Sequence, residues 1–223
     1  FARVEIKHSW SKWNQPVDYK EWGMPAHMVN AYYNPQKNLI VFPAAILQAP
    51  FYDLHQSSSA NYGGIGAVIA HEISHAFDTN GASFDENGSL KDWWTENDYA
   101  AFKEKTQKVI DQFDGQESYG ARINGKLTVS ENVADLGGIA AALEAAKREA
   151  DFSAEEFFHN FARIWRMKGR PELMKLMASV DVHAPAKLRV NVQVPNFDDF
   201  FTTYDVKEGD GMWRSPEDRV IIW

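Results

Sequence analysis

The run from Ala67 to Phe77 constrains this chain more than any other stretch. It contains His71-Glu72-Ile73-Ser74-His75 in an Ala-rich apolar sequence without Pro or Gly, which predicts a helix over about residues 65–77. Because residues four apart lie on the same face of a helix, both imidazoles can point at one place. Zinc binds neutral imidazole nitrogens at about 2.0–2.1 Å in tetrahedral geometry. Glu72 lies one step around the helix, where a general base for a metal-bound water belongs.

This motif is short, and His-Glu-x-x-His also arises by chance in long helices. Two histidines on a buried helix can instead be core residues with satisfied hydrogen bonds. The motif alone therefore leaves both interpretations open, and the rest of the chain has to decide between them.

The amino-acid composition limits the possible partners and metal ligands of the chain. The 223 residues suffice for one large or two small domains, and 44% hydrophobic residues can form a sizeable core. The net charge of −8 gives no support for a nucleic-acid or anionic membrane partner. With no cysteine in the chain, any zinc must be held by His and carboxylates.

The cellular compartment can also be predicted from the composition. The lack of cysteine fits a reducing compartment, so we expect the cytoplasm. No apolar run approaches the roughly 18 residues of a membrane span. The chain begins at Phe1 rather than Met, which indicates that the native start lies elsewhere. Secretion or a cell-surface location therefore stays open.

Periodicity and turn residues predict a mainly helical α+β fold with one small sheet in one compact unit. The expected elements are a short helix or extended lead-in and then loop over 1–25, strands over 29–33 and 39–42 joined by a turn, a surface helix over 92–114, a loop over 115–125, a helix from Ser130 to Ala150, two helical segments over 153–178 broken at Gly169-Arg170-Pro171, and strand and loop after Pro185.

The third ligand that a zinc peptidase needs is expected at Glu131, near the start of the second long helix. Ser130 is a possible N-cap of that helix. Asp135 follows Glu131 by four residues on the same face and can orient a ligand histidine through its far nitrogen. The alternative is a solvated acidic helix start, which the helix dipole favours in any case.

Several segments together resemble the neprilysin / endothelin-converting-enzyme family of zinc metallopeptidases. They run in order from about residue 18 to the C-terminus, and this combination is far more specific than His-Glu-x-x-His alone. The matching segments are Asn30–Pro35, Val41–Ala44, Leu47–Phe51, His71–Asp78, Glu131–Gly138, Arg170–Glu172, Asp181–Pro185, Arg189–Asn191 and the terminal Trp223.

The resemblance implies a thermolysin-like (gluzincin) catalytic domain over residues 1–223 that hydrolyses oligopeptides. It implies a zinc ion held by His71, His75 and Glu131. It also implies that Glu72 is the general base, that Asp135 orients one ligand histidine, and that Asp78 does the same for the other.

The resemblance further implies roles in substrate handling. His183 would stabilise the oxyanion, Arg189 would grip a substrate carbonyl, and Asn30 and Ala31 would lie on an edge strand that pairs with the bound peptide. Each has a plainer alternative. His183 fits a surface loop, Arg189 fits a salt bridge, and Asn30 fits an ordinary polar position in a strand.

The wall of the S1′ pocket, by the same resemblance, is apolar and predicts cleavage on the amino side of hydrophobic residues. Its residues would be Ile46, Phe51, Val68, Ile164 and Trp165. Simple core packing explains the same residue types, and the two roles are compatible.

The chain also departs from the family. Animal members carry disulfides and a Cys just before the terminal Trp, whereas Val220 stands in that region here and the chain has no Cys. This is similar to the bacterial oligoendopeptidase O group. Family members are also much longer, with a helical N-terminal lid domain that is absent from this chain and would be its partner within one polypeptide.

Two other functions remain open from the sequence. One is a binding or adhesion protein that keeps the fold and uses zinc structurally. The presence of Glu72 and His183 argues against such an inert relative. The other is an unrelated His-Glu-x-x-His aminopeptidase, which should show an acidic anchor for a free α-amine, and no such motif is evident.

Overall fold

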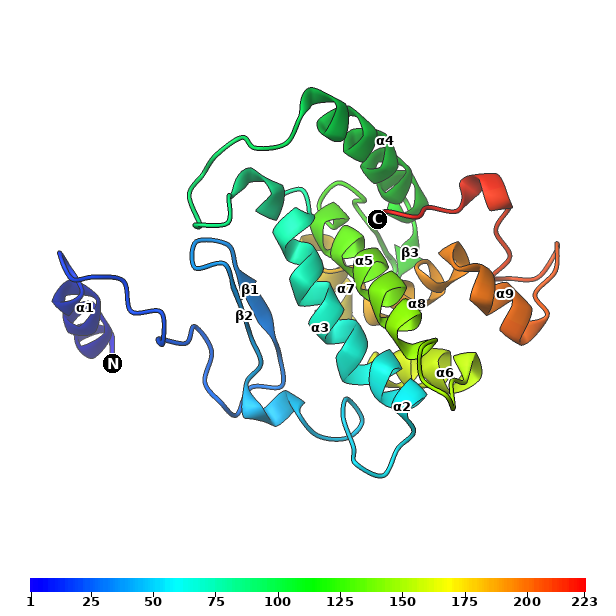
Figure 1. Cartoon of the computed structure of the whole chain (residues 1–223), viewed down its shortest axis with the longest axis horizontal. Helices are drawn as coiled ribbons and strands as arrows, with labels where there is room; N and C mark the ends of the chain where they lie inside the picture. The colour runs from blue at the N-terminus through cyan, green and yellow to red at the C-terminus, as the bar shows by residue number, and fades with distance from the viewer.

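The computed structural model describes all of residues 1–223, and helices dominate it (Figure 1). Its elements are α1 (Ala2–Ser11), β1 (Tyr32–Asn34), β2 (Leu39–Val41), α2 (Ser58–Asn61), α3 (Ala67–Ser74), α4 (Glu96–Phe113), β3 (Glu117–Ser118), β4 (Ala121–Arg122), α5 (Val129–Ala146), α6 (Ala154–Ile164), α7 (Pro171–Val180), α8 (Ala186–Asn191) and α9 (Asp198–Tyr204). The strands form two small antiparallel sheets, β1-β2 and β3-β4.

The centre of the molecule is the pair α3 and α5, which lie side by side (Figure 1). The helix predicted over 65–77 is present, with a π turn at Tyr62–Gly66 before α3 and a 3₁₀ turn at His75–Phe77 after it. The two helices approach closely because α5 carries Gly137 and Gly138 where they meet. A Cβ at Gly138 would lie 2.8 Å from the carbonyl oxygen of Ala67 and 2.8 Å from the backbone nitrogen of His71.

Apolar side chains on both sides of α5 build the core. One cluster joins α5 to α4 and the C-terminal segment, and a second joins it to α6 and α9. Their fully buried members include Val109, Phe113, Val133, Leu136, Ile139, Leu143, Phe157 and Phe161. The Ala-rich composition of α5 favours a helix, and burial on nearly all faces fixes it between its neighbours.

The amphipathic helix predicted over 92–114 is α4. Its N-cap is Thr95, whose side chain accepts a hydrogen bond from the backbone of Asp98 while the Asp98 carboxylate accepts one from the backbone of Thr95, a capping box. Phe102, Val109 and Phe113 then face the core at helical spacing. The segments on either side of Gly169 are α6 and α7, as the sequence predicted.

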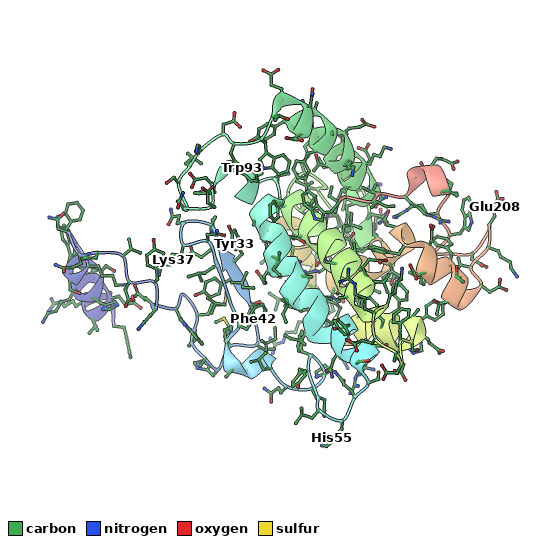
Figure 2. All side chains as sticks on the ribbon, in the orientation of Figure 1. Tyr33, Lys37, Phe42, His55, Trp93 and Glu208 are labelled. Atoms are coloured by element: carbon green, nitrogen blue, oxygen red, sulfur yellow. The ribbon has the colours of Figure 1, made fainter.

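The β1-β2 hairpin lies beside α3, where Figure 2 shows Tyr33 and Phe42. Its register pairs Tyr32 with Val41 and Asn34 with Leu39. The first strand was expected over 29–33, but it begins at Tyr32. Asn30 and Ala31 therefore lie immediately before the strand rather than within it.

Two further expectations were wrong. The loop expected over 115–125 contains the β3-β4 hairpin, whose turn residues Tyr119 and Gly120 both have positive φ (53° and 74°). Two consecutive residues with positive φ are typical of a tight hairpin turn, which usually has the sequence Asn-Gly or Asp-Gly. Here Tyr takes the first position, so the sequence did not predict the turn. The segment after Pro185 forms α8 and α9 instead of strands. Its β-branched residues favour strands locally, whereas burial of Leu188 and Phe200 against other helices decides the outcome.

The N-terminal helix α1 contributes no buried residue and lies apart from the other elements (Figure 1). A short helix was one of the two forms expected there. Along the whole chain, no helix combines the length and the apolar character that crossing a bilayer requires.

We predict that Gly138→Ala destabilises the fold. In an open helix interior this change would stabilise by about 1 kcal/mol through helix propensity. Here the new Cβ would meet backbone atoms of α3 at 2.8 Å, so the helices must separate. We expect a net loss of about 1–3 kcal/mol, as for other overpacked sites. Urea unfolding measures it, with Gly211→Ala, where nothing lies within 4 Å of the added Cβ, as the control. A more stable Gly138→Ala would contradict the close crossing.

Candidate active site

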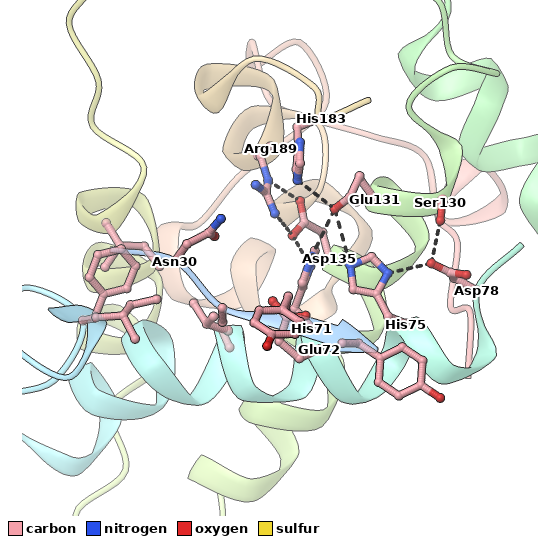
Figure 3. A pocket seen from close by; sticks show the side chains of 18 of the residues that line it. Asn30, His71, Glu72, His75, Asp78, Ser130, Glu131, Asp135, His183 and Arg189 are labelled. Carbon is pink, nitrogen blue, oxygen red and sulfur yellow. Dashed lines mark hydrogen bonds and ion pairs between the residues drawn. The ribbon is translucent and has the colours of Figure 1, made fainter. Parts of the chain in front are cut away.

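A cavity of about 470 Å³ lies where α3, α5, the β1 side of the hairpin, the end of α6 and the segment around α8 meet (Figure 3). Every residue that the sequence assigned to metal, catalysis or substrate lines this cavity. These are Asn30, Ala31, Ile46, Phe51, Val68, His71, Glu72, His75, Glu131, Asp135, Ile164, Trp165, His183 and Arg189. Residues more than 150 positions apart in the chain therefore share one site.

The two histidines of α3 and Glu131 of α5 converge at the centre of this site. The Nε2 atoms of His71 and His75 are 3.0 Å apart, and Oε2 of Glu131 lies 3.4 Å and 3.5 Å from them. Oε2 is buried and has no aligned hydrogen-bond donor. Ligands at the 2.0–2.1 Å typical of zinc would be about 3.3–3.4 Å apart along the edges of a tetrahedron. The spacing and the orphaned oxygen therefore fit a small cation such as zinc.

The charges of the three groups support the same conclusion. Burial raises the pKa of the Glu131 carboxyl, but His183, His71 and His75 outweigh burial and hold that pKa well below its usual range. Burial lowers the pKa of His75, yet Asp78 and Glu131 outweigh it and raise the pKa to about 10. A site that draws protons onto its histidines this strongly is a site of negative potential. A bound cation would take the place of those protons.

Each histidine has a carboxylate at its far nitrogen. Nδ1 of His75 donates to Oδ2 of Asp78 at 2.6 Å, an aligned hydrogen bond. Nδ1 of His71 lies 2.9 Å from Oδ1 of Asp135, close enough for an ion pair but poorly aligned for a hydrogen bond. Carboxylates in these positions can fix the tautomer and orient the ring, and that role of Asp135 and Asp78 stays a prediction.

Arg189 forms a buried ion pair with Asp135, the alternative that the sequence had left open. Its Nε and one terminal nitrogen donate to the two carboxylate oxygens at 2.8 Å and 2.6 Å, and its guanidinium lies 3.7 Å from the centroid of the Trp165 ring. Burial raises the pKa of Asp135, but Arg189 outweighs it and lowers that pKa to about 2. Arg189 also lines the cavity, so its contact with substrate stays a prediction.

Glu72 and His183 both line the cavity that contains the three candidate metal ligands. Glu72 is 5% exposed, and burial raises its pKa while His71 and His75 lower it to a smaller degree. A raised carboxyl pKa suits proton transfer near neutral pH. His183 is half exposed, its Nε2 lies 3.2 Å from Glu131, and its Nδ1 pairs with Asp181 at 2.8 Å. Contact with Glu131 raises its pKa, which favours the charged donor form.

The five apolar residues predicted for the S1′ wall are among those that line the cavity. Sequence reasoning missed other lining residues, among them Met24, Val29, Tyr33 and Asn80. Tyr33 lies within the first matching segment and could have been included on that ground. Met24 carries no local signal, because only the path of the chain before the hairpin brings it to the cavity.

The expected N-cap role of Ser130 was wrong. Helix α5 begins at Val129, with Thr128 in the cap position. The Ser130 hydroxyl instead donates to Oδ2 of Asp78 at 2.5 Å, across the gap between the start of α5 and the segment after α3 (Figure 3). The sequence spacing of 52 residues between the two gives no sign of this contact.

The chain is similar in sequence and in structure to known proteins. A sequence profile of peptidase family M13 matches residues 30–220. A Streptococcus gordonii protein named putative zinc metalloproteinase in scaA 5'region is 90% identical over 154 residues, which cover 69% of this chain and 27% of that protein. The neutral endopeptidase of Lactococcus lactis subsp. lactis is 57% identical over 223 residues, covering 100% of this chain and 36% of that protein. The crystal structure of PEPO from Lactobacillus rhamnosis has a TM-score of 0.89 and 48% identity, covering 93% of this chain and 33% of that one.

The chain therefore belongs to peptidase family M13. This confirms the family predicted from the sequence segments, and the mainly helical architecture with small sheets is confirmed as well. The chain spans only about a third of the length of these relatives, 27% and 36% of the two proteins above.

We predict that Arg189→Met strongly destabilises the protein. Methionine can fill the space, but the Asp135 carboxylate, 3% exposed, would lose its counter-ion. Breaking a buried pair in this way typically costs about 3–5 kcal/mol. Urea unfolding measures the loss. Arg122→Met is the matched control, because its pair with Glu117 is exposed and should contribute little. Equal stability of the two variants would show that the buried pair does not hold this side of the site.

Proposed function

We propose that this chain is the catalytic domain of a zinc-dependent endopeptidase that hydrolyses oligopeptides. The observation that carries the proposal is the convergence of His71, His75 and Glu131 within 4.8 Å, with the buried carboxylate of Glu72 lining the same cavity. Three protein ligands leave a fourth position open, which is typical of catalytic zinc. Membership of family M13 supports the same activity.

Zinc in this position would lower the pKa of a water molecule and polarise the scissile carbonyl. Glu72 accepts the proton of the attacking water and returns it to the leaving amide nitrogen, as general base and then general acid. His183 donates to the carbonyl oxygen as negative charge develops there. Asp135 and Asp78 hold the ligand histidines in the required orientation.

The substrate would lie along the cavity as an extended peptide. Main-chain groups at Asn30 and Ala31 pair with it as an edge strand would, and Arg189 contacts one of its carbonyls. The side chain that follows the cleaved bond enters the apolar end formed by Ile46, Phe51, Val68, Ile164 and Trp165. We therefore propose cleavage on the amino side of Phe, Leu, Ile and similar residues.

A further part of the same polypeptide would act as the lid. Relatives are about three times longer, and this chain exposes apolar residues that such a part could cover. On α7, Leu173, Leu176, Met177 and Val180 form an exposed stripe at helical spacing, and the segment after α7 carries His183. The cytoplasmic location expected from the composition stays a prediction.

The first test combines metal analysis with digestion of a peptide library by the intact protein. We expect one zinc per chain, and peptide turnover that a chelator abolishes and zinc restores. Glu72→Gln should retain zinc and fold but lose about 10²–10⁴-fold in rate, because the amide cannot accept the proton.

The positions of the cuts test the specificity in the same digest. Cuts should fall before large apolar residues, whereas cuts mostly before Lys or Asp would contradict the proposed S1′ pocket. A protein that binds zinc but never cleaves peptides would favour the binding or adhesion alternative. Removal of single N-terminal residues only would favour the aminopeptidase.

We predict that His183→Phe lowers kcat by about 10²–10³-fold with little change in KM, because the lost donor acts on charge that develops only in the transition state. Steady-state kinetics on one fluorogenic peptide measure both constants, with zinc content checked. His55→Phe is the control, since His55 lies on an exposed loop at the edge of the molecule (Figure 2). A raised KM with unchanged kcat would assign His183 to substrate binding instead.

A further inference from the structure

Asp78 is the most completely bonded carboxylate of the site. It is 2% exposed and accepts four hydrogen bonds. Its Oδ1 accepts from the backbone N–H groups of Asn80 and Gly81, both at 2.7 Å. Its Oδ2 accepts from Nδ1 of His75 at 2.6 Å and from the Ser130 hydroxyl at 2.5 Å (Figure 3). The two bonds on Oδ2 therefore join a histidine of the site to the residue next to Glu131.

The direction of the Ser130 bond follows from its second partner. The side-chain amide of Asn80 donates to the Ser130 oxygen at 3.0 Å. A serine hydroxyl has a single hydrogen. Since Asn80 occupies a lone pair of that oxygen, the hydrogen is free to go to Asp78, which as a carboxylate can only accept. Such a charge-assisted bond is among the stronger hydrogen bonds in proteins.

The two histidines are thus held by parallel arrangements. On one side, Arg189 fixes Asp135, which lies against His71. On the other side, Ser130 fixes Asp78, which holds His75. Arg189 and Ser130 come from different elements, α8 and α5, and neither contacts the ligand nitrogens that face the cavity.

We propose that Ser130 is a positioning residue for the metal site, an inference that rests on the proposed zinc function. Its hydroxyl pins Oδ2 of Asp78, so that Asp78 keeps the proton of His75 on Nδ1 and leaves Nε2 to face Glu131. It also ties the first turn of α5, which carries Glu131, to the segment that follows α3. One hydroxyl therefore sets the relative placement of two of the three ligands.

Without this hydroxyl, Asp78 keeps its two backbone donors on Oδ1, but only His75 remains bonded to Oδ2. His75 would then be oriented less strictly, and the start of α5 would no longer be hydrogen-bonded to the segment after α3. Loss of a direct partner of a ligand typically weakens metal binding about 10–100-fold. Ser130 contacts Asp78 and not the ligand His75 itself. We therefore expect a smaller effect, in which Ser130→Ala weakens zinc binding by about three- to tenfold.

The experiment measures zinc affinity in the intact protein by competition with a chelator, together with the melting temperature of the zinc-free protein. Ser130→Thr keeps a hydroxyl and should restore the affinity to within about twofold of the wild type. Ser153→Ala is the matched control. It removes a serine hydroxyl that caps α6, away from the site, and should lower the melting temperature without changing zinc affinity.

The outcomes separate the two proposals. Weaker zinc binding in Ser130→Ala, with rescue by Ser130→Thr and none of the effect in Ser153→Ala, supports the positioning role. Unchanged affinity in Ser130→Ala, or an equal loss in Ser153→Ala, would overturn it while leaving the zinc peptidase intact. A wild-type protein that binds no zinc would instead overturn the proposed function itself.

Discussion

The close approach of α3 and α5 is the constraint on which the rest of the site depends. His71, Glu72 and His75 come from one helix, and Glu131 and Asp135 from the other. The Nε2 atoms of the histidines can meet Glu131 at 3.4–3.5 Å only because Gly137 and Gly138 remove side chains from the contact. The two glycines lower the intrinsic helix propensity of α5, but they allow the candidate metal-ligating groups of α3 and α5 to approach each other closely.

The close approach of the two helices brings several buried carboxylates together, and neighbouring side chains and backbone groups stabilise their charge. Burial opposes ionisation of Glu131 and Asp135, yet both are held as carboxylates by cationic neighbours. Asp135 has Arg189, whose guanidinium also stacks on Trp165. Asp78 relies on neutral donors instead, two backbone groups and Ser130. The same geometry is therefore maintained by an ion pair on one side and by hydrogen bonds on the other.

The sequence correctly predicted the features of the site that depend on residues close together in the chain. His71 and His75 are four apart, as are Glu131 and Asp135, so helical periodicity alone places each pair on one face. The meeting of the two helices came from the family resemblance rather than from spacing. The Ser130–Asp78 bond and the Arg189–Asp135 pair span 52 and 54 residues, and tertiary packing alone creates them. Helix α8 was missed for the same reason, because its helical state depends on the partners of Leu188 and Arg189.

The distribution of charge within the cavity bears on what it can select. Its basic groups are already engaged, Arg189 with Asp135 and His183 with Glu131 and Asp181. The wall beyond them, at Ile46, Phe51 and Val68, offers apolar surface. An acidic side chain placed there would lose hydration without gaining a counter-ion, whereas an apolar one would gain by burial. In the proposed S1′ pocket, discrimination against acidic side chains would therefore follow from the absence of a free basic partner as much as from the shape of the pocket.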